Sequence, residues 1–242
     1  MDPRERKSWH GFLDLMQPPS GYRLSAALGT TFGLTIEALT AALLAMSDTD
    51  GEALANEPVA GVMAITRMRS KFRVLVLPAT IAGSFHPGSS RFVALLDRMI
   101  LQVDPGVGLF HPKVWALRFD KVPGAQSPGP DTLGRLLVGS RNLSNSTSFE
   151  LGVVFEGTVA GKGELGTPFA ADVAVALQDW LSLSNSPVPE AVMQLPGFLL
   201  RLSIDAPHEA GKRLAFHWQG LGHKPLGSVL PGKLERVVVV SP

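Results

Sequence analysis

The hydrophobic pattern of the chain predicts strands interspersed with helices. Short runs of β-branched residues and leucine that end at proline or glycine are typical of buried strands. Longer runs with apolar residues every three or four positions are typical of helices. We expect strands within residues 22–32, Phe72–Leu77, Ile100–Val103, Leu109–Phe119, Leu133–Val138, Leu151–Phe155, Leu214–Trp218 and Val237–Val240. We expect helices over Leu34–Met46, Ser90–Met99 and Thr167–Leu181, whereas Val59–Met68 fits either a helix or a strand.

Strands mixed with helices at these spacings predict an α/β layered fold. Val122–Asp131 contains three prolines and two glycines and is therefore expected to be a loop. The Ser- and Pro-rich segment Ser182–Pro189 predicts a linker, which divides the chain into residues 1–181 and a C-terminal part, residues 182–242. The valine run at Val237–Val240 either closes the sheet or opens a second half of a longer protein.

The amino-acid composition excludes several kinds of chemical site but says little about the fold. The 242 residues are enough for one α/β domain or two small ones, and 45% of them are hydrophobic, which argues against a disordered chain. The absence of cysteine excludes disulfides, thiolate nucleophiles and cysteine-type zinc sites. The net charge of +1 provides no global positive field, so any polyanion must bind to a local patch.

We expect a cytoplasmic protein that does not enter a membrane. The first seven residues are charged and are not followed by a long apolar run, unlike a secretory signal. The most apolar segment, Leu34–Met46, is too short to span a bilayer and contains Glu37.

The candidate chemistry is concentrated between residues 110 and 150. His111-Pro112-Lys113 is followed about thirty residues later by Gly139-Ser140-Arg141-Asn142, and then by Glu150. On an extended strand, His111 and Lys113 share one face at a separation of roughly 7 Å, which suits two groups that grip one phosphate.

Each side chain of this set fits a role in phosphodiester chemistry. The histidine can attack phosphorus or protonate the leaving oxygen, and the lysine neutralises non-bridging oxygens. Ser140 and Asn142 can donate hydrogen bonds to the same oxygens, and Glu150 can orient the imidazole.

Plainer interpretations exist for the same residues. His111 can be a core histidine, Lys113 a solubilising residue of an edge strand, and Gly139–Asn142 a turn that begins a helix. Trp115 and Phe119 are expected to be core residues rather than platforms for base stacking.

Basic residues recur at every second position over residues 67–73, a stretch that runs into the second predicted strand. If that stretch is extended, they form one basic stripe that suits a nucleic-acid backbone, although a solvated face is the usual meaning of such a run. These candidate nucleic-acid contacts, together with Arg141 of the second motif, are Arg67, Arg69, Lys71 and Arg73.

The pair His111-x-Lys113 and Gly139-Ser140-x-Asn142 resembles the phospholipase D superfamily, the His-Lys-Asp proteins. The resemblance covers residues 109–156, with a weaker likeness in residues 26–32. It implies a phospholipase D-like layered fold with a mixed β-sheet flanked by helices. It also implies a phosphohistidine intermediate, with no metal or other cofactor.

The resemblance also implies residue roles. His111 is the nucleophile or the acid and base, Lys113 and Asn142 bind phosphate, and Ser140 assists them. Glu150 orients His111.

Two departures from the family pattern bear on activity. The position five residues after the lysine, where the family has aspartate, is Arg118, and the nearest acid is Asp120. Only one motif is present, whereas two motifs meet at one site in the family. The second copy is expected from a homodimer mate or from a missing C-terminal half.

The resemblance favours a prokaryotic nuclease acting on DNA in phage defence, because residues 139–144 look like those of restriction and defence members. Other subunits of a defence complex are possible partners. One alternative is a phospholipid hydrolase or phosphatidyltransferase. Another is a catalytically silent nucleic-acid-binding subunit of a defence complex.

Overall fold

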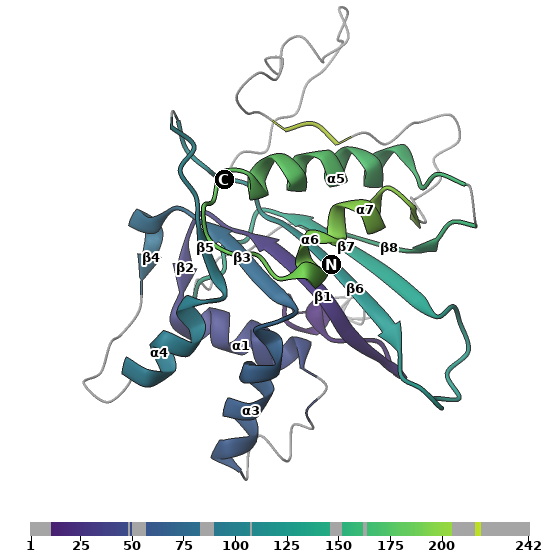
Figure 1. Ribbon diagram of the computed structural model, residues 1–242, viewed down its shortest axis with the longest axis horizontal. Coiled ribbons are helices and arrows are strands. Elements are labelled where there is room, and N and C mark those ends of the chain that lie inside the picture. Colours follow the sequence, from purple (N-terminus) through teal and green to yellow (C-terminus); the bar gives the residue numbers. More distant parts are fainter. Residues whose placement is uncertain are drawn as a thin grey trace, which may run out of the picture.

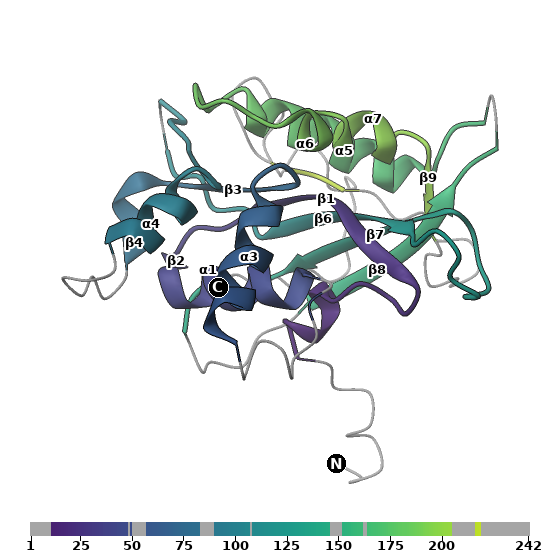
Figure 2. The same ribbon diagram turned by 60° about the horizontal axis from the view of Figure 1, so that its bottom comes forward.

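A seven-stranded mixed sheet lies between two layers of helices in the computed structural model (Figures 1 and 2). The structure describes residues 11–47, 49, 57–82, 90–106, 108–145, 152–161, 164–204 and 216–218. The first half of this part contains η2 (Asp14–Met16), β1 (Tyr22–Thr30), β2 (Leu34–Thr35), α1 (Ile36–Met46), α3 (Pro58–Met68), β3 (Phe72–Val76), η3 (Pro78–Thr80), β4 (Ile81–Ala82), α4 (Ser90–Asp97) and β5 (Ile100–Gln102). The second half contains β6 (Val114–Lys121), β7 (Thr132–Gly139), β8 (Gly152–Val159), α5 (Pro168–Leu181), α6 (Glu190–Met193), α7 (Leu195–Leu199) and β9 (Leu202–Ile204).

The sheet combines parallel and antiparallel pairs in the order β5-β3-β1-β6-β7-β8-β9. Strands β1, β3 and β5 are parallel neighbours, as expected where helices connect them. Strands β6 to β9 form antiparallel pairs, and β6 joins the two halves by pairing antiparallel with β1. The predicted α/β fold with a mixed sheet flanked by helices is confirmed.

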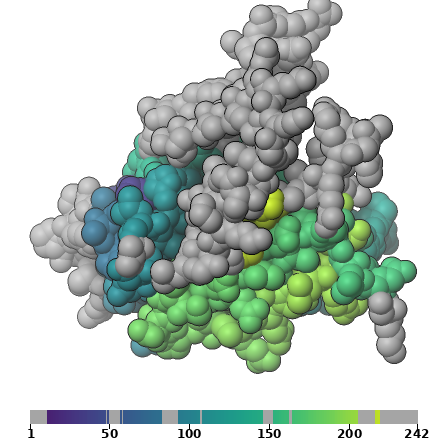
Figure 3. Space-filling model, turned by 90° about the horizontal axis from the view of Figure 1, so that it is seen from above, coloured from purple at the N-terminus to yellow at the C-terminus, as the bar shows by residue number. Residues whose placement is uncertain are grey.

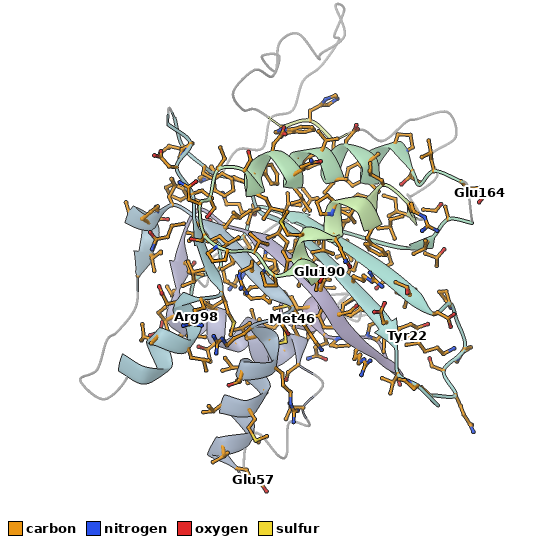
Figure 4. All side chains as sticks on the ribbon, viewed as in Figure 1. Tyr22, Met46, Glu57, Arg98, Glu164 and Glu190 are labelled. Carbon is orange, nitrogen blue, oxygen red and sulfur yellow. The ribbon has the colours of Figure 1, made fainter. Side chains whose placement is uncertain are left out.

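Each face of the sheet buries its own hydrophobic core. Along β6, Val114 and Ala116 face one cluster with α5 and α7, whereas Trp115, Leu117 and Phe119 face the other cluster with α1. Figure 2 shows α5, α6 and α7 on one side of the sheet and α1 and α3 on the other. Figure 4 shows side chains filling the space between these layers. The prediction that Trp115 and Phe119 are core residues is confirmed, since each is at most 2% exposed.

Local rules explain the element that the pattern left ambiguous. Residues 58–68 form the helix α3, which begins at Pro58. A proline is tolerated at this position because the first residues of a helix do not donate an N–H to the helix itself. Glu57 precedes the helix at its outer end (Figure 4). The apolar side chains Ala64, Ile65 and Met68 are buried at helical spacing.

The predicted strand Leu109–Phe119 starts later than expected. The strand β6 begins at Val114, so His111, Pro112 and Lys113 precede it. Pro112 has no backbone N–H to give to a sheet, which accounts for the late start. The expectation that His111 and Lys113 project from a regular strand was therefore wrong.

The chain beyond Leu181 continues the same layers. Strand β9 pairs with β8, and Phe198 and Leu199 of α7 lie in the same core cluster as α5. Residues 216–218 pack against α5 through ring contacts of Phe216 with Phe169 and Trp180 (Figure 3). These three residues are not in a strand, although Leu214–Trp218 was expected to be one. The division of the chain at residue 181 stays a prediction, and Val237–Val240 lies outside the described residues.

None of the helices in the described ranges is both long and apolar enough to span a bilayer.

Gly29 of β1 is required by the packing of Trp115. A Cβ atom at this position would lie 2.6 Å from Cζ3 of that ring, which is stacked on Phe72 and contacts Phe12 edge-on. We therefore expect Gly29→Ala to lower the free energy of unfolding by about 1–3 kcal/mol in urea denaturation.

Gly152→Ala is the matched control, because its Cβ would lie no closer than 3.7 Å to any atom. It should change the free energy of unfolding by less than about 0.5 kcal/mol. Equal urea midpoints for the two variants would contradict this account of Gly29.

Candidate active site

The antiparallel pairing of β6 and β7 brings the two sequence motifs to one corner of the sheet. Val114, the first residue of β6, is paired with Val138 near the end of β7. One further backbone bond extends this pairing, since Gly139 N–H donates to the carbonyl of Lys113 at 3.1 Å. His111-Pro112-Lys113 therefore enters the sheet beside the point at which Gly139-Ser140-Arg141-Asn142 leaves it.

Lys113 is almost completely buried, and its ammonium group lies against the imidazole. The residue is only 6% exposed, and its Nζ is 2.8 Å from Nδ1 and 3.0 Å from Nε2 of His111. The same Nζ donates to the carbonyl of His111 at 3.3 Å. The side chain of Lys113 thus folds back onto the residue two positions before it.

His111 itself is exposed to solvent. The pKa of His111 is lowered from its ordinary value, chiefly because nearby protein displaces water and secondly because the Lys113 ammonium repels a second positive charge. The neutral ring, which is the form that can attack phosphorus or accept a proton, is therefore favoured.

The connection between β1 and β2 joins the two motifs. Phe32 contacts the imidazole of His111 with a distance of 4.6 Å between ring centroids. The next residue, Gly33, donates its backbone N–H to Oδ1 of Asn142 at 3.3 Å. Two consecutive residues thus contact the key side chains of the two motifs.

Two buried threonines hold this connection in place. The hydroxyl of Thr30 accepts from the N–H of Val114 at 2.8 Å and donates to the carbonyl of Val114 at 3.2 Å. The hydroxyl of Thr31 accepts from Leu143 N–H at 2.9 Å and donates to the carbonyl of Gly33 at 2.7 Å. Thr30 therefore fixes the residue after Lys113, and Thr31 fixes the residue after Asn142.

The amide of Asn142 has one end bound and one end available. Its Oδ1 is occupied by Gly33 N–H, whereas its Nδ2 has no hydrogen-bond partner in the described part of the chain. An amide N–H₂ group without a protein partner can donate to an oxygen of a ligand. Helix α1 begins next to this bend, because Thr35, its N-cap, donates its backbone N–H to the carbonyl of Leu143.

Ser140 and Arg141 complete the second motif. Ser140 is half-buried directly after β7. Arg141 lies over the ring of Phe12, at 6.0 Å from the centroid, and Nη2 donates weakly to the carbonyl of Ser144 at 3.5 Å. Glu150, the expected orienting carboxylate, lies outside the described residues.

The basic stripe expected from Arg67, Arg69, Lys71 and Arg73 was wrong, because the chain is not extended there. Arg67 is in the last turn of α3, Arg69 caps that helix, and Arg73 is buried in β3. Nζ of Lys71 donates to the carbonyl of Leu24 at 3.0 Å. These four residues do not form one face.

Arg118, which stands where the family has aspartate, is part of another region. Its guanidinium pairs with Asp120 at 3.1 Å and lies over Phe198 at 5.4 Å from the ring centroid. It borders a cavity of about 510 Å³ that does not include His111, Lys113 or Asn142. The cavity is lined by Arg118, Pro130, Asp131, Thr132, Val159, Gln194, Gly197, Phe198 and Arg201.

Sequence reasoning missed the residues that connect the motifs. Thr30 and Thr31 are both fully buried; Thr30 is the last residue of the apolar strand β1, and Thr31 follows it directly. Two hydroxyl residues in succession at the end of such a strand are a signal that polar backbone groups nearby need partners. The stretch was singled out only for its weaker likeness to the family.

Comparisons with known proteins assign neither a family nor an activity. No family model matches the chain, and no curated protein matches it in sequence. Among solved structures, yeast tyrosyl-DNA phosphodiesterase is similar with a TM-score of 0.44 and 10% identity over 80% of this chain. A mutant of the same yeast enzyme is similar with a TM-score of 0.42 and 9% identity over 79% of this chain. The chain spans 38% of the length of each of these yeast chains.

Thr31→Val should destabilise the protein by about 1–3 kcal/mol, because it leaves a buried N–H of Leu143 and the carbonyl of Gly33 without their partner. Native-state hydrogen exchange at Leu143 should accelerate in this variant. Thr31→Ser keeps the hydroxyl and should restore most of the protection. Equal exchange in Thr31→Val and wild type would contradict the bridging role.

The pKa of His111 should respond to its lysine neighbour. Lys113→Met removes the ammonium, so the pKa of His111 should rise in an NMR titration, yet remain below the ordinary value because burial is the larger cause. Lys121→Met, at the far end of β6, should leave it unchanged. A fall in the pKa of His111 in Lys113→Met would refute the assigned cause.

The same shift predicts a pH dependence of stability. A histidine with a lowered pKa binds fewer protons in the folded than in the unfolded state, so the free energy of unfolding should decrease as the pH falls below about 6.5. His111→Asn should lose this part of the pH dependence in urea denaturation at pH 5 to 8.

Proposed function

We propose that the chain is a phosphodiesterase of the phospholipase D superfamily that acts on nucleic acid, with His111 as its nucleophile. The observation that carries the proposal is the contact of the Lys113 ammonium with the His111 imidazole beside the Asn142 bend. An unprotonated imidazole and a buried cation are the two groups that attack on a phosphodiester requires.

The chemistry follows from these groups. A ring nitrogen of His111 forms a bond to phosphorus, and the bond from phosphorus to the leaving oxygen breaks. Lys113 and Nδ2 of Asn142 stabilise the charge on the non-bridging oxygens. The leaving oxygen takes its proton from a general acid, and water then attacks the phosphohistidine, which restores His111.

The lowered pKa of His111 supports the nucleophilic role over the acidic one. A general acid must carry its proton at working pH, whereas a nucleophile must not. The general acid therefore comes from another residue, and we propose that a second motif of the same kind supplies it. Either a second copy of this chain or a further segment of a longer protein can provide that motif.

The proposed substrate is nucleic acid, and DNA is the preferred class. We also propose a role in prokaryotic defence, because residues 139–144 resemble the corresponding segment of defence proteins. Sequence reasoning placed the likeness of that segment with restriction and defence members. The single motif and Arg118 in place of aspartate are also compatible with a catalytically silent subunit that binds nucleic acid. A cleavage assay distinguishes this subunit from an active nuclease.

We expect purified protein to cleave an end-labelled oligodeoxynucleotide in the presence of a chelator. His111→Ala should abolish cleavage with an unchanged circular dichroism spectrum, and Lys113→Ala should lower the rate by about 10²- to 10³-fold. Lys121→Ala is the control and should cleave like wild type. Acid-labile ³²P on wild-type protein, absent from His111→Ala, would identify the phosphohistidine.

Other outcomes point elsewhere. Wild-type protein that binds the oligonucleotide but never cleaves it would indicate the silent subunit. Release of headgroup from phospholipid vesicles without cleavage of DNA would indicate a lipid hydrolase. Cleavage that persists in His111→Ala would refute the assigned nucleophile.

A further inference from the structure

Two arginines in the chain show how a guanidinium group is satisfied here. Arg118 uses the edge formed by Nε and Nη2 to hold Asp120, at 3.1 Å to Oδ1 and 3.4 Å to Oδ2. Arg135 uses the same edge to hold Oε1 of Glu156, at 2.7 Å from Nε and 2.6 Å from Nη2. This edge is the geometry in which arginine binds carboxylate and phosphate groups with two parallel bonds.

Arg135 also shows how the third nitrogen is used. Its Nη1 donates to the carbonyls of Leu15 and Gln17, at 2.6 and 2.9 Å. The backbone therefore holds one nitrogen in place, and the opposite edge receives an acidic group. We refer to the edge formed by Nε and Nη2 as the side-on edge.

Arg73 binds backbone carbonyls through Nη1, as Arg135 does, but it holds no carboxylate of the described residues at its side-on edge. Its Nη1 donates to the carbonyls of Arg69 and Phe72, at 2.7 and 2.6 Å. Its Nε is buried and has no hydrogen-bond partner in the ranges that the structure describes. No carboxylate in the described part of the chain forms an ion pair with Arg73, although the residue is only 8% exposed.

A buried guanidinium with an empty side-on edge is an unusual arrangement for a folded chain. An unpaired buried charge is costly, and most buried charges are therefore paired. The pKa of Arg73 is lowered, first by burial and second by the positive charge of Arg69. Neither Arg69, which caps α3, nor Arg73 of β3 forms an ion pair with a carboxylate among the described residues.

We infer that the side-on edge of Arg73, at the turn between α3 and β3, is a binding site for an oxyanion of the phosphate class. A phosphate offers two oxygens at the spacing of Nε and Nη2, and its second negative charge compensates Arg69. The site uses none of His111, Lys113 and Asn142, so it stands or falls independently of the proposed phosphodiesterase activity. The phosphate can be free in solution or part of a nucleotide or nucleic acid.

The direct test is an NMR titration of arginine Nε–H resonances in wild-type protein with inorganic phosphate, at ionic strength held constant with sodium chloride. The Nε–H resonance of Arg73 should shift and saturate. Those of Arg118 and Arg135 should stay in place, because their edges are occupied. An Arg73 resonance that does not shift, or that shifts without saturation together with the other two, would overturn the inference.

A matched pair of variants tests the same site by affinity. Arg73→Lys keeps the charge but lacks the two-nitrogen edge, so it should weaken phosphate binding at least tenfold. Arg118→Lys should bind phosphate like wild type. Circular dichroism checks that both fold; unchanged phosphate affinity in a folded Arg73→Lys would refute the site, and the titration of wild-type protein decides if that variant does not fold.

The source of the phosphate is distinguished by repeating the titration with a 5′-phosphorylated mononucleotide and with a short oligodeoxynucleotide lacking terminal phosphate. Saturable shifts of Arg73 with the oligonucleotide would indicate that backbone phosphates occupy the site. Shifts with inorganic phosphate or the mononucleotide alone would indicate a small phosphorylated ligand. No saturable shift with any of the three would overturn the inference.

Discussion

Two threonine hydroxyl groups hold the candidate site together. Thr30 brackets the backbone of Val114 and Thr31 binds the N–H of Leu143, so one dipeptide fixes both motifs. The two hydroxyl groups and the N–H groups of Val114 and Leu143 are buried, and a buried polar group that loses its partner destabilises the fold. The positions of the imidazole and of the Asn142 amide therefore depend on a few interior hydrogen bonds rather than on contacts between the two side chains. His111 is exposed to solvent, whereas Thr30 and Thr31, which position the two motifs, are buried.

The electrostatics of the site follow from the same arrangement. The regular strand begins only after Pro112 and Lys113, and the irregular segment before β6 lets Lys113 fold back onto His111. On a regular strand the lysine would project parallel to the histidine two residues before it, at a separation of about 7 Å. The departure from a strand is thus what brings the ammonium to the ring and favours the neutral imidazole.

Much of the fold was predictable, and the reasons are local. Hydrophobic runs located six of the seven strands of the sheet and missed β9. The expected core positions Trp115 and Phe119 are buried because alternation along β6 is regular. The two motifs, which were expected to bind the same phosphate, lie near one another because the antiparallel pairing of β6 and β7 brings the start of one strand beside the end of the other. The bridging by Thr30 and the burial of Arg73 were not predictable. Both depend on which strand becomes the neighbour of which, and the order β3-β1-β6 is a tertiary property that no short window of sequence contains.

The separation of these partners along the chain has a kinetic consequence. The bond from Leu143 to Thr31 closes a span of 112 residues, and that from Val114 to Thr30 closes a span of 84 residues. Non-local contacts of this kind form late, because chain entropy must be lost before they are gained. During synthesis, Thr31 must wait until residue 143 has left the ribosome before its partner exists. A fragment that ends before residue 143 therefore lacks the partner of Thr31 and cannot complete the reactive corner.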